Sequence, residues 1–119
     1  MRWRALILAA CGLCCSAALA AADVRGLRSC SKWAEERRLA EGSKEMNKIP
    51  VLISKGWFLG YLSGRQAKTR PDFLGITDNE SIYLWLDKYC REHPQEDLAS
   101  AGAALEHEMT TEQGSATSR

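Results

Sequence analysis

The chain has 119 residues, of which 45% are hydrophobic and 26% are charged, and a formal net charge of +1. This length fits one domain behind a leader, and the balanced, mixed charge excludes nucleic acid and anionic membranes as electrostatically favoured partners. A domain of about a hundred residues buries only about 60–65% of its unfolded surface, so we expect a crosslink to matter for its stability.

Residues 1–22 have the three parts of a secretory signal. Arg2 and Arg4 make a positive start, residues 5–19 are apolar or small, and small-residue cleavage sites follow after Ala20 or Ala22. The segment is too short and too rich in alanine for a good membrane span, so an uncleaved anchor is the weakest interpretation. We expect cleavage and a periplasmic or secreted mature protein without a transmembrane span.

A lipobox-like sequence overlaps this leader. Leu8-Ala9-Ala10-Cys11 has the form of a bacterial lipoprotein signal, which would place a lipid on Cys11 and tether the domain to a membrane. The apolar stretch before this cysteine is unusually short for that signal, and apolar sequence continues beyond it. Acylation therefore ranks as the alternative to simple cleavage.

The mature chain shows helical patterns and no strand pattern, which predicts an all-α, four-helix domain over residues 23–109. The first helix is expected over residues 29–41, with Ser29 as its cap and Cys30, Trp33 and Ala34 on one face. The charged residues that follow, Glu35, Glu36, Arg37 and Arg38, are expected to form a solvated face. Residues 42–47 are expected to form a loop, with nascent helix as the alternative.

The second helix is expected over residues 48–66. Pro50 fits its first turn, where a missing amide proton costs little. Residues 57–62 are apolar on all sides, which predicts a central helix with neighbours around it. A linker with Pro71 and Gly75 follows, and its apolar residues suggest that part of it packs against the domain.

The third helix opens at Thr77, where Thr77 and Glu80 have capping-box spacing. Its buried stripe is predicted to contain Ile82, Trp85, Leu86, Tyr89 and Cys90, and Pro94 either ends this helix or starts the next one. The inward face of the fourth helix is predicted to contain Leu98, Ala101, Gly102, Leu105 and Met109. Residues 110–119 are polar and small, which predicts a disordered tail.

Three of the five cysteines fall in the leader, so Cys30 and Cys90 are the pair left in the mature chain. Both are predicted on inward faces, and a bond between them would tie the first and third helices across the second. The chain-entropy model gives such a crosslink about 4 kcal/mol. The alternative is two buried free thiols; a catalytic redox pair is disfavoured because the mature chain has no Cys-x-x-Cys.

Gly56, Gly60 and Gly64 recur every four residues along the second helix. Each costs about 1 kcal/mol relative to alanine inside a helix, so some contact should offset them. Close packing of another helix is one explanation. A groove for a partner protein or an apolar ligand is the other.

The sequence carries no motif for catalysis, cofactors or metal. His93 follows Cys90 by three residues, but a disulfide-bonded Cys90 would leave His93 as a single ligand, and His107 lies between two glutamates. Phosphate-loop, dinucleotide, Gly-x-Ser-x-Gly and His-Glu-x-x-His patterns are absent. We therefore expect a binding protein rather than an enzyme, with an unrecognised small enzyme as the least favoured alternative.

Five blocks follow one another along the mature chain: Ser29-Cys30-Ser31-Lys32-Trp33, the glycine-rich residues 57–64, Ile76-Thr77-Asp78, Trp85-Leu86-Asp87-Lys88-Tyr89-Cys90 and Pro94. In this order they resemble the HdeA/HdeB-like small helical proteins of the Gram-negative periplasm, and also the Tai-type immunity proteins of type VI secretion. The first resemblance implies an acid-stress chaperone with one interhelical disulfide and possible homodimers. The second implies an immunity protein that neutralises a secreted effector.

The expected partner is accordingly another protein, either an unfolded client or an effector. The residues at 57–64 and around Cys90 depart from the acid chaperones, although many carboxylates are present for an acid response, including Asp72, Asp78, Asp87 and Asp97. An HdeA-like client-binding role is the first expectation. An immunity or inhibitor role is the alternative.

Overall fold

The computed structural model describes residues 26–67 and 72–117; the predicted signal, including Cys11, lies outside them. The described residues form helices and no strand, which confirms the all-α prediction. The elements are α1 Cys30–Ala40, the short 3-10 helix η1 Glu45–Lys48, α2 Ile49–Gln66, α3 Asn79–Glu92 and α4 Leu98–Thr117.

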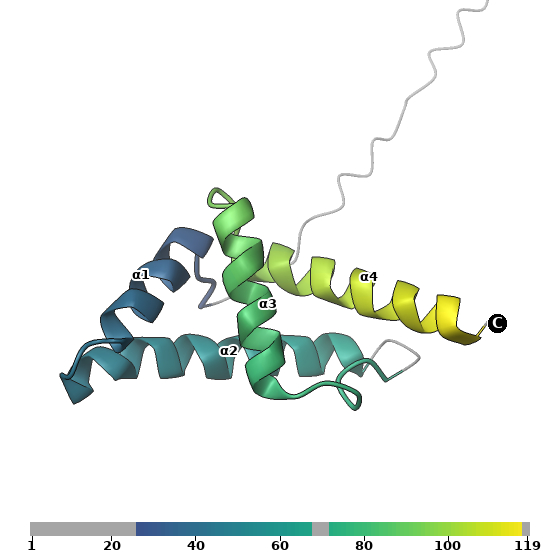
Figure 1. The fold of residues 1–119 in the computed structure, drawn as a ribbon, viewed down its shortest axis with the longest axis horizontal. Helices are drawn as coiled ribbons and strands as arrows, with labels where there is room; N and C mark the ends of the chain where they lie inside the picture. Colours follow the sequence, from purple (N-terminus) through teal and green to yellow (C-terminus); the bar gives the residue numbers. More distant parts are fainter. Residues whose placement is uncertain (1–25, 68–71, 118–119) are drawn as a thin grey trace, which may run out of the picture.

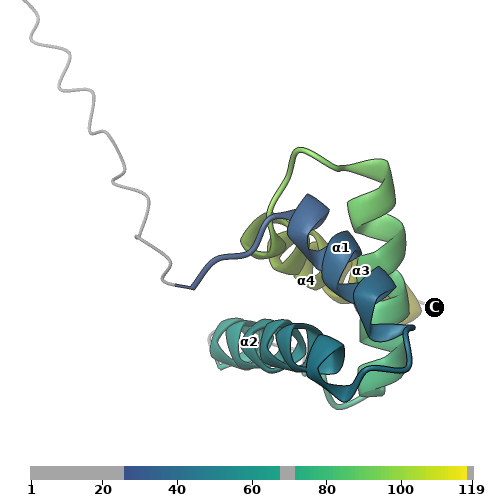
Figure 2. The ribbon, with the colours of Figure 1, turned by 90° about the vertical axis from the view of Figure 1, so that its left-hand side faces the viewer.

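Helix α2 forms one side of the domain, and α1 and α4 both lie on the same side of it, with α3 running across it (Figures 1 and 2). The buried face of α2 carries Val51, Ser54, Phe58 and Leu62. Its opposite face is open, so the prediction of a central helix with neighbours all around it is wrong. The uniform apolar run at residues 57–62 includes Gly60, which is exposed.

The core lies among α1, α3, α4 and the inner face of α2. Its largest fully buried side chains include Trp33, Phe58 and Phe73. Phe73 belongs to the segment between α2 and α3, and the Gln66 side-chain oxygen accepts hydrogen bonds from the backbone amides of Phe73 and Leu74 at 2.8 and 3.2 Å. Part of the linker therefore packs down, as its apolar residues predict.

Helix α1 begins where the sequence predicts. The Ser29 side chain accepts a hydrogen bond from the Lys32 amide. Beside this cap the chain forms an antiparallel bridge, in which the Cys30 amide donates to the Glu96 carbonyl and the Leu98 amide donates to the Arg28 carbonyl, each at 2.9 Å. The starts of α1 and α4 are thereby joined.

Two residues on α1, Glu36 and Ala34, are placed differently from the expectation. Glu36, predicted on a solvated face, is 1% exposed, whereas Ala34 is exposed. The Glu36 carboxylate accepts a hydrogen bond from Ser54 Oγ of α2 at 2.5 Å and lies 3.9 Å from Arg28 Nε. A partner on α2, distant in sequence, satisfies this buried carboxylate, and the local charge pattern carries no sign of it.

The cap of α3 is one residue later than predicted. Asp78, not Thr77, is the N-cap, and its carboxylate accepts from both the amide and the hydroxyl of Ser81 at 2.9 and 2.7 Å. This pair of contacts satisfies the helix start without the predicted Thr77–Glu80 box. The buried stripe is also rotated: Tyr83 is buried beside Ile82, Leu86 and Cys90, while Trp85 and Tyr89 are half-buried.

Helix α4 continues to Thr117, so the predicted disordered tail is wrong for residues 110–117. Thr110 Oγ1 and Thr111 Oγ1 each donate to a backbone carbonyl one turn earlier, at 2.7 Å. Gln113 Nε2 reaches the Asp72 carbonyl at 3.3 Å. The predicted inward face of this helix is confirmed: it comprises Leu98, Ala101, Gly102, Leu105 and the half-buried Met109.

Candidate functional site

Cys30 and Cys90 form a disulfide with a Cα–Cα distance of 4.8 Å, which confirms the predicted pairing. Both residues are buried. The bond joins the first turn of α1 to the last turn of α3, and these two helices pack against each other directly rather than across α2. Oxidation therefore joins α1 and α3 covalently, whereas α2 is held by noncovalent contacts, including the Ser54–Glu36 hydrogen bond.

Asp87 of α3 joins the same two helices through a polar cluster. Its Oδ1 accepts from the Trp33 indole at 2.8 Å and from Arg37 Nε at 3.0 Å, and its Oδ2 accepts from Arg37 Nη2 at 2.6 Å. This hydrogen bonding raises the pKa of the Arg37 guanidinium, which also lies over the Trp33 ring at 5.6 Å. Side chains from two successive turns of α1 thus bind the same carboxylate of α3.

The open face of α2 carries the three glycines. A Cβ atom built on Gly56, Gly60 or Gly64 meets no described atom within 4 Å. Close packing of another helix, the first explanation for this spacing, is therefore not found among residues 26–67 and 72–117. The three glycines lie along an exposed strip of α2. The second explanation for their spacing, a groove for a partner, remains a prediction.

Large apolar side chains extend the same strip toward the start of α2. Ile49, Leu52 and Ile53 are 45%, 61% and 56% exposed, and Met46 of η1 is 75% exposed. Residues 49, 52, 53, 56, 60 and 64 share one side of an α-helix. We call this set, together with Met46, the outer α2 face; large apolar side chains lie at one end of it and the three glycines lie at the other.

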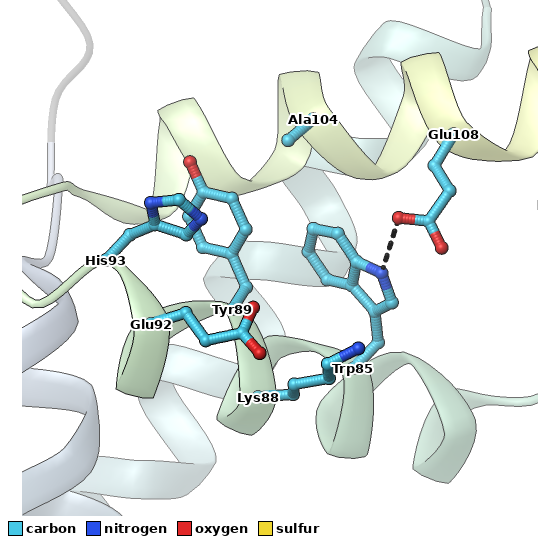
Figure 3. A pocket seen from close by; sticks show the side chains of 7 residues that line it. All are labelled: Trp85, Lys88, Tyr89, Glu92, His93, Ala104 and Glu108. Carbon is cyan, nitrogen blue, oxygen red and sulfur yellow. Dashed lines mark hydrogen bonds between the residues drawn. The ribbon is translucent and has the colours of Figure 1, made fainter.

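A separate pocket of about 220 Å³ opens between α3 and α4. Trp85, Tyr89 and His93 stack along α3 at successive turns, with ring centroids 5.2 and 4.4 Å apart (Figure 3). Glu108 of α4 accepts from the Trp85 indole at 3.0 Å. Burial, together with Glu96 and Asp97, raises the pKa of the Tyr89 phenol. The Trp85–Glu108 hydrogen bond connects α3 to α4 at this pocket.

The two histidines do not assemble a metal site. His93 is the C-cap of α3 and stacks on Tyr89, and His107 is exposed on α4. Within the described part of the chain, no group of three or more His, Cys, Asp or Glu side chains converges in a way that could hold a metal ion.

None of the described helices is both long enough and apolar enough to cross a membrane.

The Asp87 cluster has no signal in the sequence, whereas the aromatic stack does. Asp87 is one of many charged residues on a predicted helix, and its role depends on where Trp33 and Arg37 lie in space. The rings of α3 recur at i, i+4 and i+8, a spacing that places them one above another.

No protein-family model, no curated protein and no solved structure matches this chain.

Proposed function

We propose that this chain is a small exported protein that binds apolar segments of other proteins, in an HdeA-like client-binding role, through the outer α2 face. Export is inferred from the leader at residues 1–22. The observation that carries the binding proposal is the combination of exposed Ile49, Leu52 and Ile53 with a glycine strip that no described residue covers.

The glycines support the proposal energetically. Three helix-interior glycines weaken α2 by about 1 kcal/mol each relative to alanine, and no contact within the described domain offsets this loss. A bound segment can approach the backbone closely where side chains are missing, and it can cover the neighbouring Ile and Leu side chains. A face with few polar groups favours apolar segments of varied sequence, as client binding requires.

The test uses the purified oxidised protein and heat-unfolded citrate synthase as the client. Light scattering should show suppressed client aggregation, at neutral pH and again after acidification below the ordinary carboxyl pKa of about 4. The double variant Leu52→Ser/Ile53→Ser should lose at least about half of this suppression, because it removes apolar area from the outer α2 face. Leu84→Ser is the matched control, since Leu84 is 64% exposed on α3.

The absence of suppression at both pH values would sink the client-binding proposal. If Leu84→Ser loses as much suppression of aggregation as the double variant, the outer α2 face is not the client-binding surface. The immunity or inhibitor alternative predicts a different result: one stoichiometric partner, encoded by a neighbouring gene, whose toxicity the protein neutralises. Such a partner bound through the same face would replace the client role with the inhibitor role.

A further inference from the structure

An open groove of about 500 Å³ runs along the seam between α1 and α3, beside the disulfide. Its α1 side extends from Cys30 to Glu41, and its α3 side extends from Asp87 to Pro94. The disulfide, Ala34 and Pro94 give this groove an apolar lining. The groove is separate from the outer α2 face, so a ligand here would be independent of the proposed client binding.

Two arginines in the groove carry uncompensated charge. Of the five arginines that the structure describes, three lie within 4 Å of a carboxylate, and these are Arg28, Arg37 and Arg65. The other two, Arg38 and Arg91, have no such partner among the described residues, are exposed, and both line this groove. Their guanidinium groups are therefore available to an anion from outside the described chain.

The two carboxylates that line the groove limit the class of anionic ligand that it can bind. Asp87 is occupied by Arg37 and the Trp33 indole, but its carboxylate and that of Glu41 still line the groove. These negative groups would repel a ligand that carries a charge on every unit, such as a nucleic-acid strand. A ligand with a few separated anionic groups and apolar portions between them fits the lining better.

The helix geometry sets the spacing of those anionic groups. Arg91 follows Cys90, which is bonded to Cys30 at the start of α1. Arg38 lies eight residues beyond Cys30 on α1, which corresponds to roughly 12 Å along the helix axis. An extended peptide advances about 3.3 Å per residue and its side chains alternate between two faces, so carboxylates four positions apart lie on one face and span about this length.

We infer that the α1–α3 groove binds an extended acidic segment of a partner protein, with one carboxylate on Arg91 and a second, four residues away, on Arg38. The apolar residues between the two carboxylates lie over the disulfide and Ala34. Guanidinium groups pair with carboxylates through charge-assisted hydrogen bonds, and the apolar part of the lining gives the residues between the carboxylates a surface to contact.

Fluorescence anisotropy tests the inference with a labelled, end-blocked octapeptide that contains two aspartates four positions apart and alanine or leucine between them. The oxidised protein should bind it, and replacing both aspartates by asparagine should abolish binding. Arg38→Gln and Arg91→Gln should each weaken binding about five- to tenfold. Lys44→Gln, which removes the same charge at an exposed position before η1, should change it less than about twofold.

Four results would overturn the inference. One is equal binding of the asparagine peptide. Another is a loss in Lys44→Gln as large as that in the arginine variants, which would indicate general charge attraction. The third is tighter binding of an eight-nucleotide thymidine strand than of the acidic peptide. If a peptide with adjacent aspartates binds as well as the spaced one, the two-point geometry is wrong. Circular dichroism of each variant establishes that the fold is retained.

Discussion

Tyr61 of α2 lies directly against the backbone of Gly102 on α4. A Cβ atom placed on Gly102 would lie 2.7 Å from Tyr61 Cε1 and 2.8 Å from Cδ1. The Tyr61 ring cannot move aside easily, because it stacks on Trp57 at 5.3 Å and its hydroxyl accepts from Arg65 at 3.2 Å. The α2–α4 interface therefore requires a residue without a side chain at position 102.

Gly102→Ala should lower the free energy of unfolding by about 1–3 kcal/mol, because the added methyl group overpacks this interface. Gly60→Ala is the matched control: the same change on α2 meets no described atom within 4 Å and should stabilise the helix by up to about 1 kcal/mol. Urea denaturation followed by circular dichroism measures both. A Gly102→Ala protein as stable as Gly60→Ala would show that Tyr61 can shift.

Removal of the disulfide should be the largest single loss. The bond joins residues 60 apart in sequence, and the loop-closure model gives about 4 kcal/mol for the Cys30→Ala/Cys90→Ala double variant. The oxidised protein should gain the mass of two hydrogen atoms on reduction, and its urea midpoint should fall in reductant. An unchanged mass and midpoint would mean that the two thiols are free in solution.

The buried Glu36 carboxylate depends on Ser54. Ser54→Ala removes its hydrogen-bond donor while the carboxylate stays buried, so the expected loss is about 1–3 kcal/mol. In Ser63→Ala, the hydroxyl that is lost donates to the Leu59 carbonyl at an exposed site, and the expected change is below about 0.5 kcal/mol. Chemical denaturation separates the two variants. Similar effects would argue that Glu36 finds another donor.

Asp87 and Glu80 of α3 both form ion pairs, but replacing them should lower the free energy of unfolding by different amounts. Asp87→Ala leaves the Trp33 indole and the Arg37 guanidinium without their acceptor, which should cost about 2–3 kcal/mol. Glu80→Ala breaks only the pair with Lys55, in which the Glu80 side chain is largely exposed, and should cost less than about 0.5 kcal/mol. The ratio of the two losses, measured in urea, tests the central position of Asp87.

Acid should weaken the start of α3. Hydrogen bonds from the Ser81 hydroxyl and amide lower the pKa of Asp78 below its usual value. A carboxylate with a lowered folded-state pKa contributes stability above its unfolded pKa of about 4, and that contribution is lost as the pH falls through the folded-state pKa. Thermal melts at a series of pH values should therefore show a smaller acid loss for Asp78→Asn than for the wild type.

The control for this titration is Glu112→Gln, which removes an exposed carboxylate on α4. Its melting temperature should follow the wild-type curve across the same pH series. Parallel acid losses in Asp78→Asn and the wild type would contradict the role given to Asp78.

The sequence predicts those parts of the fold that depend on local pattern. Ser29 as a cap, the pairing of Cys30 with Cys90 and the inward face of α4 all follow from spacing and helical phase. Features that depend on distant partners cannot be predicted in this way. Glu36 is buried because Ser54 faces it, and Gly102 is required because Tyr61 lies on it.

In the candidate sites too, the sequence shows the residue types, whereas their position on the surface depends on distant contacts. The glycine spacing on α2 is visible in the sequence, but only the packed domain places these glycines on the outside. The charges of Arg38 and Arg91 are visible too, yet their position on opposite sides of one groove depends on how α1 and α3 pack. Local pattern fixes a helix, whereas the direction of its faces is set by tertiary contacts.

The disulfide also divides the domain by chain connectivity. Helices α1 and α2, together with nearly all of α3, lie within the covalent loop from Cys30 to Cys90, and α4 is the described helix that begins beyond it. Local unfolding can therefore release α4 while the loop stays closed. Its amide hydrogens should exchange with solvent sooner than those of α1, and each such opening would uncover Leu98, Ala101 and Leu105 as a second, transient apolar surface.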